Sequence, residues 1–178
     1  MTEPTAFVSS VPGIYAGLLK LVREAAEEQS KPVSVFPGAL AQFEPARYII
    51  VGPIKGPRYD WHAIPIQLAE EYEIQGKASY FTGETPPATE PARAAELAAE
   101  VMAQTFELFG ECVAGPAIAN RNQPTFGTTG PSAQVMFPIQ ADYTAGLDII
   151  AGQPGGWGGV IDWALTFKAI ISPSPQLG

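Results

Sequence analysis

The clearest pattern in the chain is a stripe of apolar residues at helical spacing between Pro91 and Phe109. Apolar residues recur every three or four positions, as on the buried face of an amphipathic helix: Ala94, Leu97, Ala98, Val101, Met102, Phe106 and Phe109. Thr89 is a candidate cap, Pro91 suits the first turn, and Gly110 suits a left-handed residue after the last turn. The pattern predicts a helix over residues 91–109 that buries this stripe against a sheet.

A second amphipathic helix is predicted from Pro12 to about Gln29. Its apolar side chains share one face: Ile14, Leu18, Leu21, Val22 and Ala25. Ser9 or Ser10 is placed to cap its start, because a serine hydroxyl can accept a hydrogen bond from the first turn. Residues 1–11 precede the helix, and we expect them to form a flexible N-terminal arm.

Five segments have the patterns of strands. Residues 33–36 and 47–52 are short apolar runs, whereas residues 70–81, 133–143 and 160–172 alternate apolar and polar positions. The order of these segments predicts an α+β fold, in which two helices pack on one face of a mostly antiparallel sheet of about five strands, with long loops. We assign residues 12–172 to a single domain and residues 173–178 to a C-terminal tail.

The segment 70–81 alternates most regularly. Its polar face carries Glu71, Glu73, Gln75, Lys77 and Ser79. Gly76 falls on the apolar face, where it predicts a bulge or a close backbone approach. The pair Glu70 and Glu71 is interpreted as solvated, so this strand is expected to give the sheet an acidic face.

Three loops are predicted between these elements, over residues 53–65, 113–131 and 144–159. The first is expected to be an exposed contact surface, because it holds aromatic and cationic side chains. The last contains a glycine-rich run. A phosphate-binding loop needs Gly-Lys-Ser/Thr entering a helix, whereas here no lysine follows and a strand comes next. The run is therefore interpreted as a mobile loop between strands.

The charge of the chain argues against binding to nucleic acid. The net charge is −8, and the ten basic residues are scattered along the sequence, whereas a phosphate-binding surface needs clustered Lys and Arg. No apolar run approaches the length of a membrane span, and the N-terminus lacks a signal-peptide pattern. We therefore expect synthesis in a cytoplasm, with no membrane contact.

Candidate catalytic and metal-binding groups are few. Cys112 is the single cysteine and His62 the single histidine, which rules out an internal disulfide and a metal site built from cysteines or histidines. Asp60 and His62 lack an identifiable third member of a catalytic set. We expect a protein that is not an enzyme and that has neither a cofactor nor a bound metal.

Several short stretches follow one another in a characteristic order. An amphipathic N-terminal helix precedes Val33-Ser-Val-Phe-Pro-Gly38 and Tyr48-Ile-Ile-Val-Gly52, and Glu71-Tyr-Glu-Ile then opens a long strand. The Pro91-Ala-Arg-Ala-Ala-Glu helix, a glycine-containing loop and closing strands complete the series. From about Pro12 to Ser172, this order resembles the tail terminator proteins of long-tailed, siphovirus-type bacteriophages. The loops 113–131 and 144–159 are longer than that pattern requires.

The resemblance implies a hexameric ring at the head-proximal end of the tail tube, where it ends tube polymerisation and joins the tail to the head. Partners would be further copies of the chain, the tail tube protein and a head–tail connector or neck protein, with genomic DNA passing through without specific binding. The protein would reside in the virion tail after assembly in the host cytoplasm. The alternatives are another neck, tail-completion or minor tail protein, a small-ligand-binding module, or an enzyme.

Two groups of residues are candidates for contacts in such a ring. Aromatic and arginine side chains are enriched at interfaces, which makes candidates of Arg58, Trp61, Arg121 and Trp157, although the tryptophans could instead be core anchors. Glu71 and Glu73 would line the lumen and repel DNA phosphates. Under this hypothesis, reversing both charges impairs DNA passage while rings still form, and unchanged infectivity would count against it.

Overall fold

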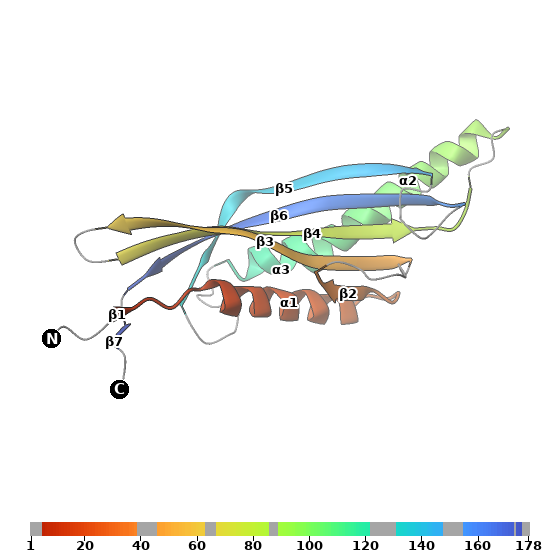
Figure 1. The fold of residues 1–178 in the computed structure, drawn as a ribbon. Helices are drawn as coiled ribbons and strands as arrows, with labels where there is room; N and C mark the ends of the chain where they lie inside the picture. Colours follow the sequence, from red (N-terminus) through yellow and green to blue (C-terminus); the bar gives the residue numbers. More distant parts are fainter. Residues whose placement is uncertain are drawn as a thin grey trace.

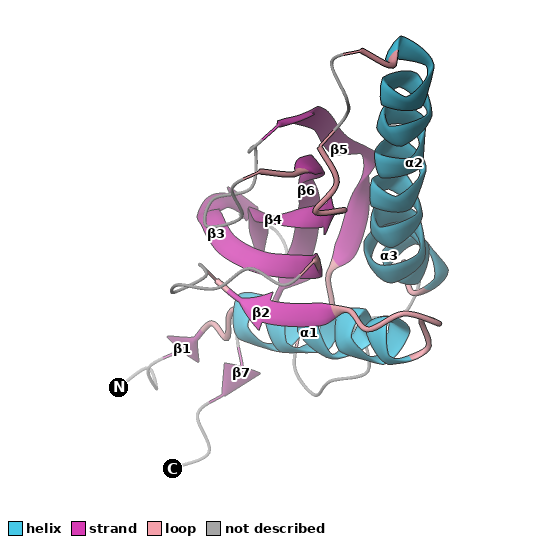
Figure 2. Cartoon of the chain, turned by 90° about the vertical axis from the view of Figure 1, so that its right-hand side faces the viewer, coloured by secondary structure: helices cyan, strands magenta, loops and turns pink. Residues whose placement is uncertain are grey.

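The computed structural model of the protein describes residues 5–38, 46–62, 67–85, 89–121, 131–147, 155–172 and 174–175. Helices lie on one face of a five-stranded sheet (Figures 1 and 2), which confirms the predicted α+β fold. In chain order the elements are β1 (Thr5–Ala6), α1 (Val11–Glu27), β2 (Ser34–Pro37), β3 (Arg47–His62), β4 (Gln67–Phe81), α2 (Pro91–Phe109), the π-helical turn η1 (Gly110–Ala114), α3 (Gly115–Ala119), β5 (Gln134–Leu147), β6 (Trp157–Ile171) and β7 (Ser174–Pro175).

The sheet has the strand order β2-β3-β4-β6-β5, and β2 and β3 are its single parallel pair. β1 and β7 form a separate two-stranded ladder near the chain ends (Figure 1). The helices cover the face on which β6 places its apolar side chains, as predicted: Ile161, Trp163, Leu165, Phe167, Ala169 and Ile171. No helix of the described chain covers the opposite face, which we call the open face.

Helix α1 forms where the apolar spacing predicts it, and it buries Ile14, Leu18 and Val22. The prediction that Ser9 or Ser10 caps its start is confirmed in part. Ser10 occupies the capping position, but its hydroxyl makes no cap hydrogen bond to the helix. The Ser9 hydroxyl instead accepts a hydrogen bond from the Val11 N–H, at 3.2 Å.

Helix α2 has the predicted bounds, but its buried stripe is rotated. Met102 and Phe106 are 48% and 46% exposed, whereas Thr105 is buried and its hydroxyl donates to the Val101 carbonyl at 2.6 Å. Thr89 is not the cap, because Glu90 occupies that position. The sequence marked Met102 and Phe106 as core residues, so apolar side chains remain on the outside of this helix.

The sequence suggested that helical structure ends at Gly110, but it continues beyond this residue. Gly110 has right-handed helical angles (φ −64°, ψ −48°), and the chain continues through η1 into α3. The physical reason is that Cys112, Val113 and Ala117 are apolar at helical spacing and are buried in the main core. Helical structure therefore occupies part of the predicted loop 113–131; residues 122–130 lie outside the described residues.

Strand β3 runs to His62, so the predicted loop 53–65 is wrong over residues 53–62. The Gly-Pro pairs that suggested a loop instead coincide with two register shifts, between Val51 and Ile54 and between Lys55 and Arg58. A bulge accommodates a glycine with positive φ and a proline without an N–H donor. Together β3 and β4 make a long hairpin, in which β3 continues well beyond the end of β2 while β6 accompanies β4 almost to its start (Figure 1).

The predicted loop 144–159 is also wrong at both ends, because β5 continues to Leu147 and β6 begins at Trp157. Its last glycine has a packing role. A Cβ added to Gly159 would lie 2.6 Å from Thr105 Oγ1 and 2.8 Å from Val101 Cγ1. Glycine therefore lets α2 lie close to the sheet; residues 148–154 lie outside the described residues.

Candidate assembly surface

The open face carries charged side chains in rows that cross several strands. Residues directly opposite each other in antiparallel ladders point to the same face, and the registers align three rows there: Arg58–Glu71–Lys168, Lys55–Glu73–Thr166 and Lys77–Asp162–Asp142. Every row places a cation beside a carboxylate. The carboxylates of β4 lie on this face, as expected, and the neighbouring strands β3 and β6 place cations beside them.

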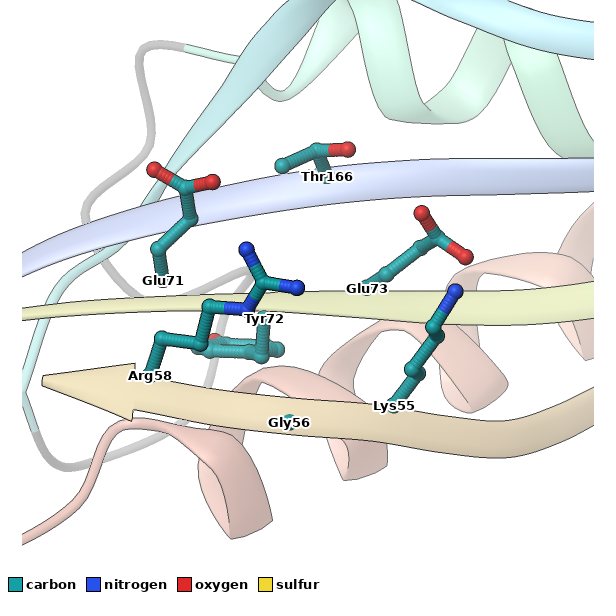
Figure 3. A pocket seen from close by; sticks show the side chains of 7 residues that line it. All are labelled: Lys55, Gly56, Arg58, Glu71, Tyr72, Glu73 and Thr166. Carbon is teal, nitrogen blue, oxygen red and sulfur yellow. The ribbon is translucent and has the colours of Figure 1, made fainter.

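Two of these rows border a hollow of about 160 Å³ (Figure 3). Its lining residues are Lys55, Gly56, Arg58, Glu71, Tyr72, Glu73 and Thr166. Gly56 at the bulge of β3 has a φ of +102°, and a Cβ there would lie 3.3 Å from the Glu71 carbonyl oxygen, so glycine lets β3 lie close to β4 beside the hollow. The Gln75 side-chain amide donates to Glu73. In the described chain, neither Lys55 nor Arg58 forms an ion pair within 4.0 Å.

The chemistry of the hollow suits a protein partner. Its two cations and two carboxylates remain available to opposite charges on another surface. A phosphate group would meet the repulsion of Glu71 and Glu73. The mixture of both signs therefore favours recognition of a surface that also carries both signs.

Three of the six sequence-predicted residues meet at this hollow, namely Arg58, Glu71 and Glu73. The other three lie elsewhere. Trp61 is 63% exposed on the helix-covered side of the hairpin, where its ring packs edge-on against Phe7 at 5.2 Å between centroids. Arg121 is exposed just after α3.

Trp157 begins β6 and is half-buried. Its backbone N–H donates to the Glu84 carbonyl at 3.1 Å, and its carbonyl accepts from the Thr82 N–H at 3.1 Å. The indole N–H is buried and has no hydrogen-bond partner in the described chain. The backbone of Trp157 thus joins β6 to the segment that follows β4.

Glu70 was interpreted as solvated, and this is wrong, because its exposure is 0%. Its carboxylate accepts hydrogen bonds from the Ser9 hydroxyl at 2.5 Å, the Ser10 hydroxyl at 2.5 Å and the Ser10 N–H at 2.8 Å. The Ser10 hydroxyl is also 3.1 Å from the Tyr72 hydroxyl, whose pKa is raised by burial. The alternation of residues along β4 could have indicated this burial, because Glu70 lies on the same strand face as the apolar residues Tyr72 and Ile74.

Other candidate chemistry is limited in the described chain. Cys112 is buried, and burial, followed by the charge of Glu111, raises the pKa of its thiol to about 11. A thiol with a raised pKa carries little thiolate and is a poor nucleophile near neutral pH. The described residues contain no group of three His, Cys, Asp or Glu placed to hold a metal ion, and none of their helices could span a membrane. The side chain of His62 lies outside the described residues.

Comparisons with known proteins give a distant structural likeness. No protein-family model matches the chain, and no curated protein matches it. A solved structure described as "Virion of native gene transfer agent (GTA) particle" contains a chain with 10% sequence identity and a TM-score of 0.38, over 90% of this chain and 98% of that one. At that identity and score, the likeness assigns no function to this chain.

Proposed function

We propose that this protein is a structural subunit of a phage-like tail, which assembles into a closed ring and ends the tail tube at its head-proximal side. The observation that carries the proposal is the open sheet face, whose charged rows lie between two strand edges that no described strand covers. Such a surface suits assembly through repeated contacts between copies. The resemblance of the sequence to tail terminator proteins also supports the proposal.

The proposed position of Glu71 and Glu73 is the lumen of the ring, with the open face turned inward. Arg58 and Lys168 lie directly opposite Glu71, and Lys55 lies opposite Glu73. This lumen would present both charge signs to DNA and would be screened at physiological salt. We propose that DNA passes because no basic cluster binds its phosphates. Repulsion of the phosphates by Glu71 and Glu73 contributes less, because cations lie beside both carboxylates.

Tube assembly tests this function. Tail tube protein polymerised with the purified chain should give shorter tubes that carry extra density at one end in negative-stain images. Tube protein alone, and tube protein with an unrelated acidic protein of similar mass, are the controls. Tubes of unchanged length with bare ends would contradict the terminator role; density without a change in length would instead indicate a neck or tail-completion protein.

A further inference from the structure

Strand β5 leaves a long edge of the sheet unpaired. Residues 140–147 form a regular ladder with β6 on one side, and in the described chain no strand pairs with their other side. Proline, lysine and bulges normally protect such an edge from pairing with another strand. From Gln140 to Leu147 the edge contains none of these, because its bulge lies before Gln140.

Apolar side chains stand next to this edge on the helix-covered side. Phe106 of α2 contacts Tyr143 of β5, with 5.3 Å between ring centroids. Met102 lies one turn earlier on α2 and is exposed, as is Leu147 at the end of β5. A strand added to β5 would therefore find backbone partners and an apolar surface together, which is the usual form of β-strand addition.

On the open face, the same edge carries an uncompensated charge. Asp142 lies directly opposite Asp162, and like charges in this position destabilise a sheet. Lys77 pairs with Asp162 at 2.6 Å, whereas Asp142 has no cation within 4.0 Å in the described chain. A partner that brings a cation to the open side of β5 would remove this repulsion.

The complementary groups occur on the opposite edge of the same sheet. Beyond Val51, no described strand pairs with the outer side of β3. There Lys55 and Arg58 place on the open face two cations that form no ion pair with the described residues, while Tyr59 and Trp61 are exposed on the other face. Residues 58–62 contain no proline, so none of the N–H groups that point away from β4 is missing along this edge.

The strand directions also agree. The antiparallel pairs β3–β4, β4–β6 and β6–β5 make β3 run opposite to β5. A second copy that continues the sheet would therefore place its β3 antiparallel to β5. Its cations would share a face with Asp142, and its aromatic side chains would share a face with Met102 and Phe106. The required stagger between strands is normal in closed sheets, whose strands tilt.

We propose that the outer edge of β5 binds the half of β3 that continues beyond β2, residues 53–62, from a second copy of the chain. The two edges lie on opposite sides of the sheet, so the contact is heterologous, and repeating it can close a ring. This inference rests on the proposed ring and identifies its subunit contact.

A charge exchange tests this contact. Asp142→Arg and Arg58→Asp should each weaken ring formation at least tenfold in the concentration required, measured by sedimentation velocity. The double variant, which exchanges the charges, should restore most of the loss. Glu28→Arg makes the same charge change at the exposed end of α1 and should assemble like the native chain. Thermal unfolding of each variant checks that folding is unaffected.

The outcomes separate the contact from the proposed function. If both single variants form rings as well as the native chain, the edge contact is overturned. A double variant whose assembly is not restored would also overturn it. In both cases the proposal of a ring would stand. Variants that form rings but no longer cap tubes would overturn it in favour of tube protein as the partner of β5. A native chain that forms no ring would overturn the proposed function, and the contact with it.

Discussion

Replacing Gly76 with alanine is expected to destabilise the protein by more than about 3 kcal/mol, the upper end of the usual overpacking cost. A Cβ at this position would lie 2.1 Å from the Ile50 carbonyl oxygen and 2.2 Å from Cζ2 of Trp163. One of these contacts is backbone of the adjacent strand, and the other is a buried indole. Relief would require moving β3 or Trp163 within the sheet.

The matched control is Gly146→Ala. Gly146 also lies in a strand, but an added Cβ meets no heavy atom within 4 Å. Urea unfolding should therefore show a small effect at Gly146, within about 0.5 kcal/mol, and a large effect or insoluble protein at Gly76. If Gly76→Ala unfolds at the native urea concentration, the close approach of Trp163 to β4 is wrong.

The second large effect is expected for Glu70→Gln, which should lower the free energy of unfolding by about 2 kcal/mol. The carboxylate accepts from three donors on Ser9 and Ser10. The glutamine amide would direct its own N–H groups toward at least one of these donors. A buried donor without an acceptor bears the full cost of desolvation, and hydrogen bonds to charged groups are the stronger ones.

Amide exchange gives a local measurement of the same contact. The Ser10 N–H donates to Glu70 Oε2 at 2.8 Å, so in Glu70→Gln it should exchange faster than in the native chain. Glu71→Gln is the control, because Glu71 is the exposed next residue of the strand. Equal exchange at Ser10 in both variants would show that Glu70 does not hold the segment before α1.

The sequence predicted the elements whose stability comes from regular spacing. The bounds of α2 and the buried face of β6 followed from apolar periodicity, because burial of one face determines both. Gly76 was predicted to mark a bulge or a close backbone approach, and the structure shows the close approach, opposite a register shift in β3. Local composition was sufficient in these cases.

Predictions from the sequence were wrong or incomplete where the environment of a residue depends on residues far away in the chain. Glu70 is buried because Ser9 and Ser10, about sixty positions earlier, supply its donors. The Gly-Pro pairs of β3 resemble a loop until pairing with β4 places them in bulges. Similarly, β4 read alone looked acidic, because the cations opposite it belong to β3 and β6.

The candidate surface was predicted in part. Arg58, Glu71 and Glu73 were chosen for different roles, and strand register brings them to one hollow. The edge position of β5 did leave a mark in the sequence, because Pro138 within the strand pattern 133–143 suggests an edge strand or a bulge, and β5 has both. Met102 and Phe106 belong to the apolar stripe of the helix and were assigned to the core. The helical pattern does not show which part of a wide apolar stripe the rest of the protein covers.

The mass of the purified protein in solution, measured by native mass spectrometry over a wide range of concentrations, tests the central claim most directly. A heterologous contact that closes on itself gives one assembly with a fixed number of copies. We therefore predict a single multimer whose mass stops increasing once the ring is complete. A strict monomer at every concentration, or a series of ever longer oligomers, would contradict the ring.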